Sequence, residues 1–338
     1  MNPRGRIIVE SVATAVVAYA MAGLTEATLI RAIRPTELEL DWSSDVVLSV
    51  ALGVAVYLWR HLQVTRNELL EHERAELVIH TQLSLAGEMQ RRYLPVVPPA
   101  ADGYEWAATL ISAGKIGGDF YDFVEESPGI WLVLVADVSG KGIPAAMALG
   151  SLRSMFRTLA RTRQEPAQLV SLLAAALREE WAGSPYVTCI LARFETHDRR
   201  VTYTNAGHPA GIILGRYDAR YLTLGGPPAG LLPTAQFEQE VVALDAGDIC
   251  LFVSDGVTEA LEGSSQPVPE AIAAIARENA GSASSICHAL MARAQEGHGP
   301  PGIAQWDDDR TVVVVTLGDA KSTGPPDSAK SDQTERNL

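Results

Sequence analysis

Apolar residues gather in two runs near the start of the chain. Ile7–Leu24 is apolar at almost every position except Glu10, and Val46–Trp59 follows after a polar stretch. A membrane-spanning helix needs about 20 apolar residues. Arginines flank the pair of runs, whereas the loop between them holds more acids than bases. The pattern predicts a transmembrane hairpin over residues 1–61, with the remainder of the chain in the cytoplasm at the bacterial cell membrane. A buried helical hairpin of a soluble domain is the alternative.

The following segment, residues 62–99, has the spacing of a coiled coil. It contains one glycine, and proline occurs only in the stretch 95–99 that ends the predicted helix. Two rows of positions repeat every seven residues, which predicts a helical linker that forms a parallel homodimer. A single amphipathic helix is the alternative, since Glu76 and His72 interrupt the rows. The rows are Leu62, Leu69, Glu76, Leu83, Gln90 and His72, Ile79, Ala86, Tyr93.

Residues 100–318 alternate apolar runs with Gly and Pro, as in a layered domain. Strands come first, a helical pair follows, and further strands come after it, so we expect an α+β fold rather than a doubly wound sheet. The tail, residues 319–338, is almost free of apolar residues and is predicted to be disordered. The expected strands are Trp106–Ile111, Trp131–Ala136, Tyr186–Phe194, Val201–Thr204, Gly211–Leu214, Glu240–Leu244, Ile249–Val253 and Thr311–Leu317. The expected helices are Ile143–Arg163, Pro166–Trp181, Pro269–Asn279 and Ser284–Gln295.

The net charge and the spacing of the cysteines exclude some classes of function. The chain has 27 basic and 41 acidic residues, a net charge of −14, so no nucleic-acid partner is implied. Its three cysteines lie far apart without a CxxC pair. This excludes a cysteine-based zinc site and argues against a disulfide framework.

Several aspartates stand where an apolar run meets a turn. Asp137 ends WLVLVAD, Asp255 ends ICLFVSD, Asp119 follows two glycines, and Asp308 and Asp309 precede RTVVVV. A single aspartate in such a place is usually a turn former or a helix cap. Several together would repel one another unless cations lay between them, and carboxylate oxygens select Mg²⁺ or Mn²⁺. The pattern therefore predicts a site for two such ions, which would activate water for attack on a phosphoryl group.

Five motifs in order resemble a known family. They are GGDFYDF at 117–123, ADVSGKGIPAAMAL at 136–149, NAGHPA at 205–210, GDICLFVSDGVTEA at 247–260 and DDRTVVVV at 308–315. They are similar to those of the bacterial SpoIIE/RsbU-like branch of the metal-dependent (PPM) Ser/Thr protein phosphatases, and EMQRRYLPVVPP at 88–99 resembles the segment that leads into that domain. The resemblance covers residues 86–318 and implies an αββα sandwich with a dinuclear Mn²⁺ or Mg²⁺ site at one edge.

The resemblance also implies the metal ligands. Asp137 would bridge the two ions beside the Val138 carbonyl, Asp255 and Asp308 would fill further positions, and Asp119 would bind directly or through water. Asp137 and Asp255 would thereby carry catalysis. Asp309 replaces Asp308 if the register slips, although the first aspartate of the DDxT pattern matches better.

The chain departs from the family's pattern in places. Lys141 stands where some members have histidine, and no counterpart is assignable to the phosphate-binding arginine of animal relatives, so the metals would hold most of the substrate phosphate. His208 is expected to stabilise a turn, with catalysis as the alternative. Asp122 is expected to be structural, with a role behind the metal ligands as the alternative.

The resemblance implies a protein phosphatase that uses metal-activated water. Its substrate would be a phosphorylated bacterial regulatory protein, such as an anti-sigma-factor antagonist. The alternative is a catalytically inactive, membrane-tethered binding module that sequesters a signalling partner. A complete set of aspartates argues against this alternative.

Overall fold

The computed structural model describes residues 42–140, 142–182, 184–262, 266–296 and 308–318, with scattered positions between 12 and 29. The chain divides into two compact units, residues 1–81 and residues 82–338. Helix α2, Trp42–Tyr93, begins in the first unit and ends in the second.

Helix α2 continues through the predicted boundary between residues 61 and 62. Its 52 residues include no proline, and the helix ends just before Leu94 and Pro95. The second apolar run, Val46–Trp59, is thus one stretch of α2. Nowhere in the described residues is a helix both long enough and apolar enough to cross a membrane. The predicted transmembrane hairpin therefore has no support there, and most of Ile7–Leu24 lies outside the described residues.

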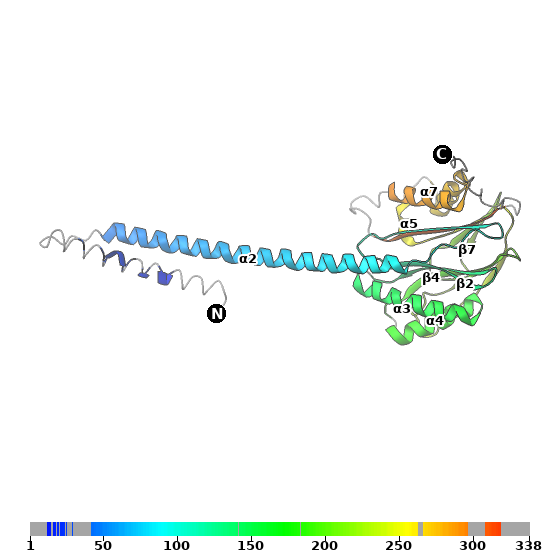
Figure 1. Cartoon of the computed structure of the whole chain (residues 1–338), viewed down its shortest axis with the longest axis horizontal. Coiled ribbons are helices and arrows are strands. Elements are labelled where there is room, and N and C mark those ends of the chain that lie inside the picture. The colour runs from blue at the N-terminus through cyan, green and yellow to red at the C-terminus, as the bar shows by residue number, and fades with distance from the viewer. Residues whose placement is uncertain are drawn as a thin grey trace, which may run out of the picture. The chain divides into compact units, whose positions relative to one another are not determined.

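The second unit contains two stacked β-sheets, each covered on its outer face by helices (Figure 1). In one sheet the strand order is β1-β11-β10-β6-β7. In the other it is β2-β3-β4-β5-β8, and β9 also pairs with β5. The first sheet consists of β1 Tyr104–Ile111, β11 Arg310–Leu317, β10 Ile249–Val253, β6 Gly211–Leu214 and β7 Ala219–Leu222. The second consists of β2 Asp119–Ser127, β3 Ile130–Val138, β4 Val187–Glu195, β5 Arg200–Ala206, β8 Gly225–Gly226 and β9 Glu240–Ala243.

Alternation along the strands builds three apolar layers. In β3, Leu132 and Leu134 pack against α3 and α4, whereas Val133 and Val135 face the other sheet. The layer between the sheets contains Phe252 and Val313 from the first sheet, and α6 and α7 cover the outer face of that sheet. The helices are α3 Ile143–Leu159, α4 Pro166–Trp181, α5 Asp255–Ala260, α6 Val268–Glu278 and α7 Ala283–Glu296, with a 3₁₀ turn at Ala160–Thr162. The predicted αββα sandwich is confirmed.

All eight expected strands and all four expected helices are present, with ends that differ by a few residues. Strand β2 was not predicted, because its two aspartates and the preceding glycines are typical of a loop. The short elements β7, β8 and α5 were missed as well. Pairing in β2 places Asp119 directly opposite Asp137, a relation that the sequence pattern did not reveal.

The last turns of α2 belong to the compact unit that holds both sheets, residues 82–338. Gln90 pairs with the backbone of Gly117 in both directions: its Nε2 donates to the carbonyl at 2.7 Å, and its Oε1 accepts from the amide at 3.1 Å. A Cβ atom on Gly87 would lie 2.0 Å from the carbonyl oxygen of Lys115. The end of α2 is therefore fixed tightly against the segment between β1 and β2.

Candidate metal centre

Three aspartates meet at one edge of the sandwich. Asp119 is the first residue of β2, and its ladder partner Asp137 is near the end of β3. Asp255 begins α5, with Ser254 alone between it and the end of β10. One carboxylate oxygen from each lies within 4.8 Å of the others. The two sheets thus contribute to one cluster, since β2 and β3 belong to one sheet and β10 to the other.

The cluster carries a high electrostatic cost in the absence of cations. Burial raises the pKa of Asp119 well above its usual value, opposed by a hydrogen bond from Thr311 and increased by the charge on Asp137. Burial also raises the pKa of Asp255, with a further contribution from the charge on Asp308. Asp308 lies outside the group of three mutually close carboxylates, but it is near enough to add to the negative field.

Gly118 lets the backbone approach the cluster. A Cβ atom there would lie 2.7 Å from the carbonyl oxygen of Val138 and 2.9 Å from Oδ1 of Asp137. The two oxygens therefore lie on the same side of this glycine, and any larger residue would displace one of them. The amide of Val138 donates to the Gly118 carbonyl at 3.1 Å, which holds the strands together here.

The donor set fits a hard divalent cation. It consists of clustered carboxylate oxygens with the Val138 carbonyl oxygen beside Asp137, and no thiol or imidazole is part of the acidic group found among the described residues. Oxygen donors of this kind suit Mg²⁺ and Mn²⁺. Asp119, Asp137, Val138, Asp255 and Asp308 remain the predicted ligands.

Asp309 plays a different part from its neighbour. Its Oδ1 accepts from the Ala113 amide at 2.8 Å, and its Oδ2 accepts from the amides of Gly118 at 2.6 Å and Asp119 at 3.3 Å. Asp309 therefore holds the backbone segment that positions Asp119. The sequence analysis did not predict this role of Asp309. The DDxT spacing marked this residue only as an alternative ligand.

Thr311 was also missed. Its Oγ1 donates to Oδ2 of Asp119 at 2.7 Å, and its amide donates to the Ser254 hydroxyl at 2.9 Å. These bonds orient Asp119 from the opposite sheet. The threonine of the DDxT pattern was the available signal.

Asp122 and His208 lie apart from the three clustered carboxylates. The Asp122 carboxylate is fully buried and pairs with Arg157 of α3 through two bonds of 2.7 Å, which join β2 to that helix. His208 is buried, its Nδ1 lies 3.0 Å from the Thr188 hydroxyl, and burial lowers its pKa to about 3. These contacts fit the structural roles expected for both residues. Lys141 lies outside the described residues.

Comparison with known proteins gives the family. The model of the family described as Stage II sporulation protein E (SpoIIE) matches residues 127–318, more than half of the chain. The phosphoserine phosphatase RsbU of Bacillus subtilis is 27% identical over 219 residues, which cover 64% of this chain and 63% of RsbU. The phosphoserine phosphatase RsbP of the same species is 23% identical over 183 residues, 53% of this chain and 45% of RsbP. The matched region is thus less than two thirds of either relative.

Solved structures share the fold. The SiaA-PP2C domain of Pseudomonas aeruginosa superposes with a TM-score of 0.60 at 18% identity, covering 71% of this chain and 97% of that domain. The PP2C phosphatase domain of SpoIIE from Bacillus subtilis, with a fragment of its regulatory domain, gives 0.55 at 18% identity and 63% coverage of each chain. The family model matches more than half of the chain and spans Asp137, Asp255 and Asp308. The chain therefore belongs to the SpoIIE family, and its sandwich has the fold of these solved domains.

Proposed function

We propose that this protein is a divalent-metal-dependent phosphatase that hydrolyses phosphoserine or phosphothreonine in a bacterial regulatory protein. One observation carries the proposal: three buried or half-buried carboxylates from two sheets converge within 4.8 Å at the edge of a SpoIIE-family domain. Such an arrangement is costly without cations, so its presence favours a metal-dependent activity over a purely structural role.

Two Mn²⁺ or Mg²⁺ ions are the cofactors that we propose. Asp137, the Val138 carbonyl, Asp255 and Asp308 would hold these ions, and Asp119 would hold them directly or through water. When bound, such ions lower the pKa of a coordinated water and neutralise phosphoryl charge.

The surrounding residues hold the carboxylates in place. Asp309 fixes the backbone before Asp119, and Thr311 fixes its carboxylate with a hydrogen bond. Without cations the negative field of the cluster repels a phosphomonoester dianion. The residues that contact the carboxylates therefore supply orientation, and positive charge from another source is needed to bind the substrate phosphate.

The proposed substrate is a phosphorylated regulatory protein, and the family resemblance points to an anti-sigma-factor antagonist. Two relatives, RsbU and RsbP, are named phosphoserine phosphatases, which supports a phosphoserine substrate. An inactive module that sequesters a partner is the alternative, and an assay of turnover separates the two.

The test is hydrolysis of p-nitrophenyl phosphate and a phosphoserine peptide by the full chain with Mn²⁺. EDTA should abolish turnover, and Asp137→Asn and Asp255→Asn should each reduce kcat by about 100-fold or more, equivalent to roughly 3 kcal/mol of barrier. Asp198→Asn, which removes an exposed carboxylate, is the matched control. Turnover that persists in EDTA, or that survives Asp137→Asn, would contradict the proposal.

We further propose a homodimer through α2. Within the described residues, Leu62, Leu69 and Ile79 of the predicted rows are 67%, 59% and 55% exposed. Pairing of two such helices would bury these side chains, and light scattering of the full chain tests it.

Association with the bacterial membrane, with the phosphatase domain in the cytoplasm, stays a proposal from the apolar runs alone. Fractionation of cells with a carbonate wash tests it. Recovery of the full chain in the soluble fraction would contradict it.

A further inference from the structure

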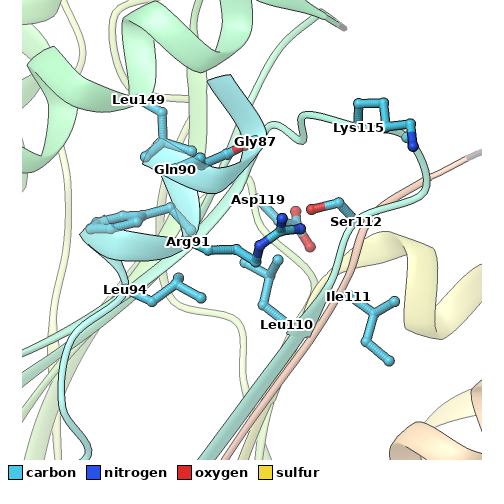
Figure 2. A pocket seen from close by; sticks show the side chains of 12 residues that line it. Gly87, Gln90, Arg91, Leu94, Leu110, Ile111, Ser112, Lys115, Asp119 and Leu149 are labelled. Carbon is cyan, nitrogen blue, oxygen red and sulfur yellow. The ribbon is translucent and has the colours of Figure 1, made fainter. Parts of the chain in front are cut away.

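A pocket of about 260 Å³ opens beside Asp119 (Figure 2). The last turns of α2 form one wall, and the segment between β1 and β2 forms another. Arg91, Ser112 and Lys115 bring two positive charges and a hydroxyl to this pocket. The pocket therefore places positive side chains beside an aspartate of the candidate metal centre.

Arg91 is directed into the pocket. Figure 2 shows its guanidinium and the Ser112 hydroxyl extending toward the Asp119 carboxylate, while Lys115 lies farther out on the loop. Among the described residues, the side chains of Arg91 and Lys115 form no hydrogen bond or ion pair. Arg91 is therefore not a counter-ion that neutralises Asp119 in the structure, and its donors are available to a ligand.

The end of α2 that carries Arg91 is held against the loop between β1 and β2. Its neighbour Gln90 is held to Gly117 by two hydrogen bonds, and at Gly87 the absence of a side chain allows the helix to pack closely on the loop. A guanidinium on so fixed a backbone loses less freedom when it binds a ligand than one on a mobile segment would. The planar fork of arginine also matches two oxygens of a phosphate group.

We propose that Arg91, assisted by Ser112 and Lys115, forms a subsite for the phosphoryl oxygens of the substrate. This deepens the proposed function and rests on it. Arg91 would donate to phosphoryl oxygens on the side away from the carboxylates, so the metals would not hold the phosphate alone. The positive charge comes from a helix that precedes the phosphatase motifs, where motif comparison finds no counterpart of a phosphate-binding arginine.

The test compares Arg91→Ala, Arg91→Lys and Lys115→Ala in the full chain saturated with Mn²⁺. Arg92→Ala is the matched control, because Arg92 is adjacent and exposed but does not line the pocket. Three quantities are measured: the KM for a phosphoserine peptide, the inhibition constant and calorimetric Kd of inorganic phosphate, and the Kd of Mn²⁺.

Arg91→Ala should raise the KM and both phosphate constants by about tenfold or more, as expected for loss of a charge-assisted bidentate contact. Arg91→Lys should fall between it and the wild type, Lys115→Ala should have a smaller effect, and Arg92→Ala should match the wild type. Affinity for Mn²⁺ should not change in any variant.

Two outcomes would overturn the subsite. One is phosphate binding by Arg91→Ala as tight as by Arg92→Ala, and the other is a loss of Mn²⁺ affinity that accounts for the whole defect. Both leave the proposed function intact if the wild type is active. Conversely, an inactive wild type would refute the proposed function, and the phosphate titration would still decide whether Arg91 binds the anion.

Discussion

At the scale of single residues, Asp308 and Asp309 are adjacent and chemically identical, yet their surroundings separate them. Asp308 adds negative charge near Asp255, whereas the Asp309 carboxylate accepts from three backbone amides. One is placed to attract a cation, and the other to hold a loop. Substitution of Asp308 should therefore affect mainly metal binding, whereas substitution of Asp309 should affect mainly the stability of the fold.

Asp308→Asn should reduce turnover and Mn²⁺ affinity while leaving the melting temperature of the metal-free protein nearly unchanged. Asp309→Asn should retain more turnover, because an amide oxygen still accepts from the loop, but it should lower that melting temperature by a few degrees, equivalent to about 1 kcal/mol. Parallel assays of turnover and thermal unfolding check this. Equal losses of metal affinity in both variants would assign Asp309 to the ligands.

His208 should make the protein sensitive to acid. Its pKa is lowered from 6.5 to about 3 because the protonated ring would be buried. A depressed folded-state pKa contributes stability above pH 6.5 that is lost as pH falls toward 3, by up to about 1.4 kcal/mol per pH unit. Urea unfolding of His208→Gln should show a shallower loss of stability over this range. His288→Gln, at an exposed position, serves as the control and should follow the wild type.

At the scale of secondary-structure elements, helix α2 links two compact units. Its predicted rows repeat every seven residues, and Leu62, Leu69 and Ile79 leave an apolar face exposed within the described residues. The same helix ends against the loop that precedes Asp119. If α2 forms the homodimer proposed above, a change in its pairing would act on an element that contacts the loop before Asp119.

Insertion of four residues after Glu76 should shift the apolar rows around the helix and weaken the homodimer. Because the last turns of α2 remain fixed to the loop, the phosphatase domain should stay folded while its activity changes. Insertion of seven residues is the control, since it restores the repeat. If the chain is monomeric by light scattering and neither insertion changes its activity, α2 is only a spacer.

The sequence predicted elements well where alternation and burial agree. In β3 and β11 the buried apolar runs are long, and that of β11 is β-branched, so both strands were located from pattern alone. It failed at β2, where Asp119 and Asp122 are buried polar residues that a strand tolerates only because Thr311 and Arg157 satisfy them. Those partners are distant in sequence, so no local pattern reveals them. The same holds for Arg91, whose neighbourhood depends on the packing of α2 against a loop.

At the scale of the whole molecule, the carboxylates of the candidate metal centre come from both sheets. Asp119 and Asp137 come from one sheet, and Asp255 follows a strand of the other. A cation held by all three would tie the sheets together at an edge that is otherwise repulsive. Metal binding should therefore be visible as stability of the fold as well as activity.

Mn²⁺ at about 100 times its Kd should stabilise the protein by about 2.7 kcal/mol per site. Thermal unfolding at several Mn²⁺ concentrations checks this, with Ca²⁺-free EDTA buffer as the reference. Asp137→Asn should remove most of the gain, and in EDTA it should melt at or above the wild-type temperature because carboxylate repulsion is relieved. A wild-type melting temperature that does not change with Mn²⁺ concentration would contradict a metal site between the sheets.

The close packing of Gly87 and Gln90 on the loop has a consequence for protein engineering. A chimera that joins a foreign sensor to this phosphatase domain needs its junction upstream of residue 82, in phase with α2. A junction at residue 100 would keep every strand of the sandwich, yet it would discard Gln90 together with the adjacent Arg91 and leave Gly117 without its partner. In any exchange of modules, the final turns of the helix therefore have to be kept together with the β-sandwich.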